Sequence, residues 1–288
     1  MTVLPGSRAS RPGWLRSPLV RNKTYLFALL LLTLIVLVAV FAPLLAPYDP
    51  IVGDLGLSLN PPSGEHWLGT DQQGRDILSR IIWGGRSTLL AALGVVLLSE
   101  LIGIPLGLMA GYFGGRVDAI ITRGLDVILA FPPLLLAFVT ASVFGRGLEN
   151  AVLTLSVTYA PQIARVVRSV VLVERETAYV EAAKALGASD SRILTMHIPR
   201  NIVSPILVQS SIDLAYAILD LAALGFLGLG VQPPTADWGA MLSEGREHLL
   251  ISPNLAIAAG IAVMLSVIAF NLVGDGLRAH FDPKRRKS

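Results

Sequence analysis

Long apolar stretches, separated by short charged segments, constrain the fold of this chain more than any other feature. Residues 25–45 carry no charge and are numerous enough for a helix to cross a hydrocarbon core of ~30 Å. Over the whole chain 53% of residues are hydrophobic and only 15% are charged, whereas a soluble domain usually has about a quarter of its residues charged. These properties predict an all-α, polytopic membrane protein.

Six apolar stretches fit transmembrane helices. The first is longer than the ~7–15-residue apolar region of a cleaved signal peptide, so it is expected to remain in the chain. The fourth becomes charged at Arg165 and Arg168, and its end should therefore project from the bilayer. The expected spans are 25–45, 88–113, 117–144, a stretch that starts near 151, 202–224 and 251–273.

Both ends of the chain are basic, and this predicts the topology. The residues before Tyr25 include five Lys or Arg and no Asp or Glu. A membrane span follows at once, so a cytoplasmic orientation signal is favoured over a nucleic-acid-binding tail. Two cytoplasmic termini require an even number of spans. The expected divisions are a basic tail 1–24, a first helix 25–47, an extracytoplasmic segment 48–86, a transmembrane domain 87–276 and a basic tail 277–288.

A polar segment, 174–201, interrupts the apolar stretches on the expected cytoplasmic side. Its good helix formers end at Gly187, and glycine readily takes the left-handed conformation that terminates a helix. Ser189 can then cap a second short helix. Ala182 and Ala183 keep the first helix narrow enough to enter a groove on another protein. On spacing alone, an ordinary solvated loop is an equal alternative.

The motif Glu181-Ala182-Ala183, three residues, then Gly187 resembles the signature loop of ABC importer permeases. The resemblance implies a type I ABC importer transmembrane fold and a coupling helix that docks onto a cytoplasmic ATPase. The chain departs from the family at Ile198-Pro199-Arg200-Asn201, where the proline comes one position early. The residues that the resemblance assigns to docking are Tyr179, Glu181, Ala182, Ala183, Lys184, Leu186 and Gly187.

Three further segments, 66–80, 130–133 and 238–246, resemble permeases of the dipeptide, oligopeptide and nickel group. The resemblance implies that this chain forms half of a translocation pathway in the plasma (inner) membrane, with peptides as the expected cargo. It also implies a homologous second permease subunit, two ATP-binding subunits and an extracytoplasmic solute-binding protein as partners. ATP and magnesium would be bound by the partner subunits.

No catalytic motif accompanies these features. The sequence has no cysteine and no G-x-x-x-x-G-K-[ST], H-E-x-x-H or G-x-S-x-G, which are the motifs of phosphate-binding loops, zinc proteases and serine hydrolases. We therefore expect no enzyme activity, metal or other cofactor in this chain.

Several residues inside the expected spans suggest packing or transport roles. Gly103, Gly107 and Gly111 form a smooth stripe that permits close helix contact. Arg123 and Asp126 are expected to pair on one helical face. Intramembrane carboxylates cost ~3 kcal/mol on insertion scales and mark candidate pathways. The pathway candidates are Glu100, Asp213 and Asp220.

Each of these carboxylates has an alternative explanation. Glu100 fits a protonated, hydrogen-bonded structural residue as well as a pathway. Asp213 and Asp220 lie two helical turns apart and suit a proton relay, a cation site or a polar helix interface.

In the extracytoplasmic segment, Asp71 is expected to cap a short helix. This helix either lies on the membrane surface or serves as a gate or receptor contact.

Three other functions remain open. One is an ABC permease for nickel or another small solute, although no histidine lies in a predicted span and imidazole is a natural nickel ligand. Another is an ion-coupled secondary transporter that uses Glu100, Asp213 and Asp220. The third is a membrane scaffold without transport.

Overall fold

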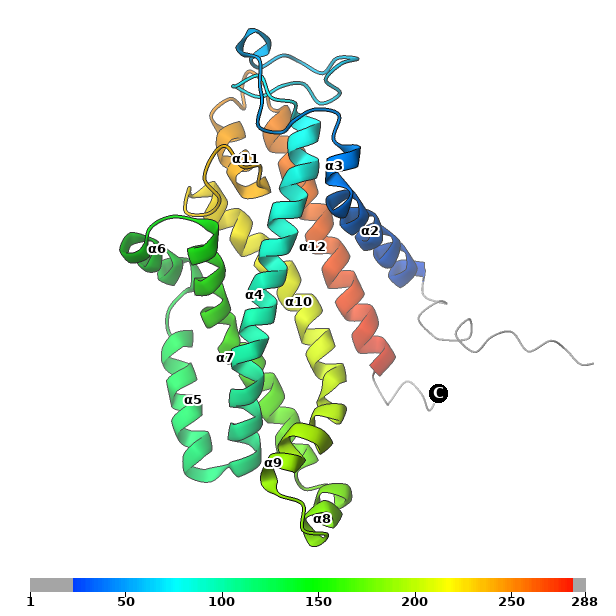
Figure 1. Cartoon of the computed structure of the whole chain (residues 1–288), viewed down its shortest axis with the longest axis vertical. Helices are drawn as coiled ribbons and strands as arrows, with labels where there is room; N and C mark the ends of the chain where they lie inside the picture. The colour runs from blue at the N-terminus through cyan, green and yellow to red at the C-terminus, as the bar shows by residue number, and fades with distance from the viewer. Residues whose placement is uncertain (1–22, 282–288) are drawn as a thin grey trace, which may run out of the picture.

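The computed structural model describes residues 23–281, and in this range the chain is an elongated bundle of helices without a named β-strand (Figure 1). The basic tails predicted at 1–24 and 277–288 lie largely outside the described residues. The long helices are α2 (Lys23–Val40), α4 (Ile77–Phe113), α5 (Gly115–Leu129), α6 (Pro133–Phe144), α7 (Leu148–Glu174), α10 (Pro199–Phe226) and α12 (Asn254–Phe281). The short ones are α3 (Ala42–Leu45), η2 (Leu55–Leu57), α8 (Ala178–Ala185), α9 (Asp190–Arg192), η3 (Ile193–His197) and α11 (Trp238–Arg246).

Among the described residues, four helices are long and apolar enough to cross a membrane, namely α2, α4, α10 and α12. The third predicted span, 117–144, is not one straight helix, because α5 and α6 meet at an angle of 81°. Pro132 and Pro133 lie at this break, and proline disfavours helical conformation in the residue before it. The fourth predicted span corresponds to α7, whose second half contains Arg165 and Arg168.

Helix α4 extends well beyond its predicted start at residue 88. The expected short helix capped by Asp71 does not exist as a separate element. Instead α4 begins at Ile77, and Asp76 caps it by accepting a hydrogen bond from the Ser79 N–H at 2.7 Å. With 37 residues, α4 is about 55 Å long, which is longer than a hydrocarbon core of ~30 Å, so its N-terminal end projects past the apolar stretch.

Helices α4 and α7 pack closely through the glycine stripe. A Cβ atom at Gly103 would lie 2.6 Å from the backbone oxygen of Ala160, and one at Gly107 would lie 2.5 Å from that of Ala164. At Gly111 the nearest atom would be the Cβ of Val171, at 2.8 Å. Such distances leave no room for any side chain at these glycines, so α4 and α7 are in close contact along about two helical turns.

Helix α10 begins earlier than the sequence suggested. Pro199 occupies its first turn, where a missing N–H costs nothing because that group has no partner inside the helix. Pro205, predicted for the first turn, therefore lies inside the helix. The early proline in the signature loop thus starts α10.

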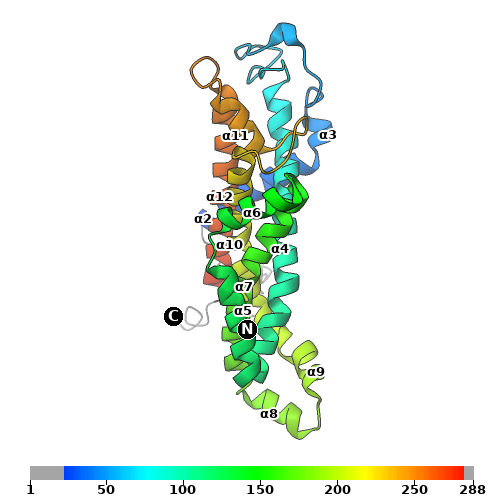
Figure 2. The ribbon, with the colours of Figure 1, turned by 90° about the vertical axis from the view of Figure 1, so that its left-hand side faces the viewer.

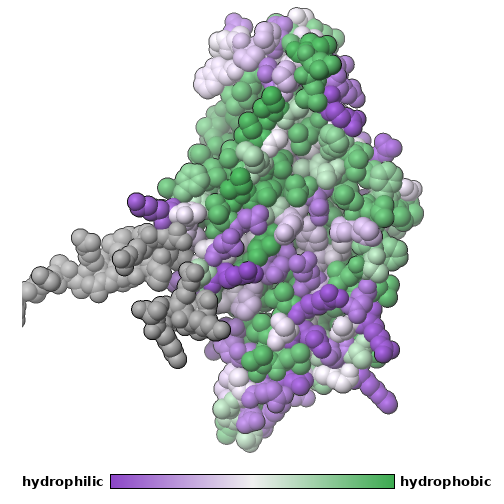
Figure 3. All heavy atoms as spheres, turned by 180° about the vertical axis from the view of Figure 1, so that it is seen from behind, coloured by the Kyte–Doolittle hydropathy of each residue, from purple (hydrophilic) through white to green (hydrophobic). Residues whose placement is uncertain are grey.

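The bundle has two different ends. The loops of residues 48–76 lie at one end of the long axis, together with α11, and α8 and α9 lie at the other (Figures 1 and 2). Seen from behind, hydrophobic residues form a broad band below the top of the molecule, and hydrophilic residues lie at the top and throughout the lower half (Figure 3).

Candidate functional site

The exposed face of α8 is the candidate site. Five exposed residues at positions i, i+3, i+4, i+7 and i+8 share this face: Ala178, Glu181, Ala182, Ala185 and Leu186. Four of them are apolar, and Leu186 is 89% exposed. A narrow apolar face at the tip of the molecule is suited to a groove on another protein, as in helix-in-groove recognition.

The end of α8 is fixed by a Schellman motif around Gly187. Gly187 has φ +81°, the left-handed conformation that the sequence predicts for it. Its N–H donates to the Lys184 oxygen at 2.9 Å, and the Ala188 N–H donates to the Ala183 oxygen at 3.0 Å, which is the hydrogen-bond pair of this motif. The helix therefore stops at a defined residue.

The next helix starts where the sequence predicted. The Ser189 side chain accepts a hydrogen bond from the Arg192 N–H at 3.3 Å and caps α9. This cap and the left-handed Gly187 set the angle between α8 and α9. The exposed face of α8 is thus held by local backbone hydrogen bonds.

Buried side chains anchor the opposite face of this segment. Val180, Ile193 and Ile198 are fully buried and belong to one apolar cluster with α7 and α10 residues. The Tyr179 hydroxyl donates to Glu174 Oε2 at 2.6 Å, and the Asn201 amide donates to the same oxygen at 3.0 Å. Burial and the hydrogen bond to Glu174 raise the pKa of Tyr179.

Segment 174–201 also contacts the C-terminal end of α4. The Tyr112 hydroxyl donates to Asp190 Oδ1 at 2.6 Å, and the Lys184 ammonium lies 5.2 Å from the Tyr112 ring centre. Arg175 donates to the Gly111 oxygen at 3.0 Å. Movement of α8 is therefore coupled by direct contacts to α4, which packs along α7.

The seven residues predicted for docking divide into two groups. Tyr179 and Ala183 are half-buried and pack against the apolar cluster, so they hold α8 in place. The other five are exposed: Glu181, Ala182, Lys184, Leu186 and Gly187. Sequence reasoning did not single out Tyr112 or Asp190 as partners, because they are 78 residues apart in the chain.

The three pathway candidates have different surroundings. Glu100 on α4 accepts a hydrogen bond from Ser210 of α10. Asp213 is 3% exposed and accepts from Gln209 at 2.8 Å, while Asp220 accepts from the Tyr159 hydroxyl at 2.6 Å. Asp213 and Asp220 therefore contact different partners, and the structure joins Glu100 to α10 through Ser210.

The predicted pair of Arg123 with Asp126 is wrong. Asp126 contacts Arg165 of α7 at 2.5 Å. A second inter-helix pair joins Asp118 of α5 to Arg168 of α7, also at 2.5 Å. These bridges attach α5 to α7, and the charges that ended the fourth apolar stretch were their only signal in the sequence.

A buried ion-pair cluster lies at the other end of the bundle. Arg80, which is fully buried, contacts Asp71 and also Glu244 Oε2 of α11 at 2.6 Å. Arg75 contacts Asp71 at 2.8 Å and Glu244 at 3.2 Å. The cluster joins the predicted extracytoplasmic segment to α11.

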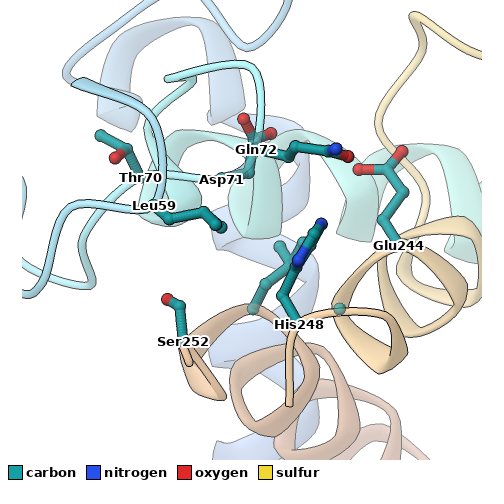
Figure 4. A pocket seen from close by; sticks show the side chains of 9 residues that line it. Leu59, Thr70, Asp71, Gln72, Glu244, His248 and Ser252 are labelled. Carbon is teal, nitrogen blue, oxygen red and sulfur yellow. The ribbon is translucent and has the colours of Figure 1, made fainter. Parts of the chain in front are cut away.

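The cavity beside this cluster is small. Asp71 and Gln72 lie on one side of it, with Glu244 and His248 opposite (Figure 4). Its volume of ≈10 Å³ admits one water molecule at most. The role of the cluster is therefore structural, because it holds the segment before α4 against α11. Across residues 23–281 no group of three or more His, Asp or Glu is arranged to hold a metal ion.

Comparison with known proteins gives matches along nearly the whole chain. The family model described as "Binding-protein-dependent transport system inner membrane component" matches residues 103–287. A model of the N-terminal transmembrane domain of oligopeptide transport permease C matches residues 15–62.

Individual relatives match at similar levels. A probable D,D-dipeptide transport system permease protein of Escherichia coli (strain K12) is 43% identical, covering 88% of this chain and 85% of the relative. A glutathione transport system permease protein of Pectobacterium atrosepticum is 44% identical, with the same two coverages. A di/tripeptide transport system permease protein of Pseudomonas aeruginosa is 42% identical over 93% of this chain and 90% of the relative.

Among solved structures, the methionine ABC transporter in inward-facing conformations shares the fold. The TM-score is 0.57 at 21% identity, and the match covers 72% of this chain and 98% of that chain.

Proposed function

The chain belongs to the family of binding-protein-dependent transport system inner membrane components, and on this premise we propose that it forms half of the translocation pathway of an ATP-driven peptide importer. The exposed face of α8 carries the proposal. It is narrow and largely apolar, and its opposite face is attached to α4 and α7 by direct contacts, which are the properties that a coupling helix needs. The chain itself is a multi-pass membrane transporter subunit, and ATP hydrolysis belongs to separate ATPase subunits.

The proposed assembly has three kinds of partner subunit. A homologous permease subunit forms the second half of the pathway. Two ATP-binding subunits dock on the cytoplasmic side and bind ATP with magnesium. An extracytoplasmic solute-binding protein delivers the cargo. The proposed docking surface consists of Glu181, Ala182, Lys184, Leu186 and Gly187, with Tyr179 and Ala183 holding it in place. Glu100, Asp213 and Asp220 are proposed to line the pathway.

Peptides are the proposed cargo. The relatives above are named for dipeptides, di- and tripeptides, and glutathione, which is itself a tripeptide. These names favour peptides over nickel.

Uptake in a strain that lacks this chain tests the cargo. We expect loss of di- and oligopeptide uptake, restored when the chain returns with its partner subunits, and unchanged nickel uptake. The ATPase subunits should copurify with the tagged chain. Normal peptide uptake together with lost nickel uptake would assign the cargo to nickel, and ATP-independent transport would favour a secondary transporter.

The proposed topology places both termini in the cytoplasm. The chain has no cysteine, and Ser63 and Ser189 are both exposed at opposite ends of the bundle, so single-cysteine variants report each end. In intact cells, Ser63→Cys should react with a membrane-impermeant maleimide and Ser189→Cys should react only after permeabilisation. External labelling at residue 189 would reverse the topology.

A further inference from the structure

Arg86 on α4 lies where two surface pockets meet. One pocket, of ≈430 Å³, is apolar and lies between α2, α4, α10 and α12, with Val40, Leu93 and Phe270 in its wall. The other, of ≈370 Å³, is lined by residues of the outer loops, including Asp49. Arg86 and Leu90 line both pockets, so an elongated ligand can occupy the two together.

The position of Arg86 corresponds to the level of lipid headgroups. The next charged residue along α4 is Glu100, so Arg86 lies at the outer end of the apolar stretch of this helix. Trp83 is one turn away, with its ring centre 5.6 Å from the Arg86 guanidinium. Tryptophan and arginine are typical of membrane–water interfaces.

Arg86 also lacks a counter-charge. Within residues 23–281 its guanidinium forms no ion pair and no hydrogen bond, although the side chain is exposed beside an apolar groove. A guanidinium in this setting is suited to a phosphate group, which it can bind through two parallel hydrogen bonds.

The apolar pocket continues inward from Arg86 along one face of α4. Leu89, Leu90 and Leu93 follow at i+3, i+4 and i+7 and line it, so the groove runs about 10 Å into the membrane region. Leu214 and Phe270 form its far wall. An acyl chain fits this shape and chemistry.

The outer pocket supplies a partner for a cationic headgroup. Asp49 is exposed and lines the same pocket as Arg86. Its Oδ1 accepts the Ile51 N–H at 2.7 Å and the Val52 N–H at 3.3 Å, and its Oδ2 has no such bond to the loop. Arg86 and Asp49 thus place one cation and one carboxylate at the rim of the groove, where they match a phosphate group and an ammonium group of the same ligand.

We propose that the chain binds one glycerophospholipid with an ethanolamine headgroup at this groove. The phosphate contacts Arg86, the ammonium contacts Asp49, and one acyl chain lies along α4 between α2 and α12. The site faces the outer leaflet and is independent of the proposed docking face, which lies at the opposite end of the bundle (Figure 1).

Native mass spectrometry of the full chain, purified with its partner subunits, tests the proposal. The probes are phosphatidylethanolamine and phosphatidylglycerol of equal chain length. Arg86→Gln and Leu93→Trp should each lower the bound phosphatidylethanolamine about tenfold, because one removes a charge-assisted contact and the other fills the groove. Asp49→Asn should abolish the preference for ethanolamine over glycerol headgroups.

Two matched variants serve as controls. Arg146→Gln removes another exposed arginine outside both pockets, and Leu101→Trp adds the same ring at an exposed position two turns further along α4. Both should keep wild-type lipid occupancy. Equal occupancy in Arg86→Gln and wild type would overturn the proposal. Photo-crosslinking from position 93 to the second permease, instead of to lipid, would assign the groove to that subunit.

Discussion

The double variant Ala182→Asp, Gly187→Val is expected to abolish ATP-driven peptide uptake while the chain remains inserted at its normal level. Ala182 lies on the exposed face of α8, so aspartate there would place an unpaired charge in the proposed interface. An uncompensated buried charge costs roughly 3–5 kcal/mol, which corresponds to a loss of affinity of about 100-fold or more. Gly187 has φ +81°, and a β-branched residue disfavours positive φ, so the end of α8 would also change direction.

Uptake, copurification of the ATPase subunits and membrane abundance should be measured together. Gly64→Val is a matched control, because Gly64 is a loop glycine without positive φ and with open space around it, at the opposite end of the molecule. We expect normal uptake in this control. Wild-type uptake by the double variant would show that segment 174–201 is only a linker between α7 and α10.

Local rules predicted local features well. The end of α8 at Gly187, the cap at Ser189 and the glycine stripe on α4 each depend on residues within a few positions of one another. Glycine conformation, N-caps and helical periodicity are therefore sufficient to place them. The hydropathy of the long stretches likewise predicted that each is helical, but it missed the 81° break between α5 and α6.

Non-local contacts were missed. Asp126 has Arg123 three residues away, yet it pairs with Arg165 of a neighbouring helix, because the packing of α5 on α7 decides which cation is within reach. Helix α4 begins at Ile77, well before its apolar stretch, because Asp76 caps it and Arg80 is neutralised by Asp71 and Glu244. A charge that appears to end a span is thus accommodated inside the helix.

The pathway carboxylates show the same limit. The seven-residue spacing of Asp213 and Asp220 predicted a shared face, but their hydrogen-bond partners lie on different helices, Gln209 on α10 itself and Tyr159 on α7. Spacing along one helix predicts only the direction in which each side chain points. The neighbouring helix determines which residues that side chain contacts.

Replacing Gly103 and Gly107 together by alanine is expected to cause the largest loss of folded protein. The two new Cβ atoms would lie 2.6 and 2.5 Å from the backbone oxygens of Ala160 and Ala164, so α4 and α7 would have to separate. Overpacking a well-packed interface typically costs roughly 1–3 kcal/mol per site. Because backbone atoms form the contact, no side-chain rotation can relieve it.

Gly94→Ala on the same helix is the matched control. Its Cβ would meet only Val152, at an ordinary contact distance of 3.5 Å. Fluorescence-detected size exclusion after a series of heating steps should show a lower midpoint and less monodisperse protein for the double variant, and an unchanged profile for Gly94→Ala. The close packing of α4 on α7 at the glycine stripe also positions the residues that contact α8. The double variant should therefore lose ATPase copurification in proportion to its loss of folded protein. An unchanged thermal midpoint in the double variant would mean that α4 and α7 are further apart than this packing requires.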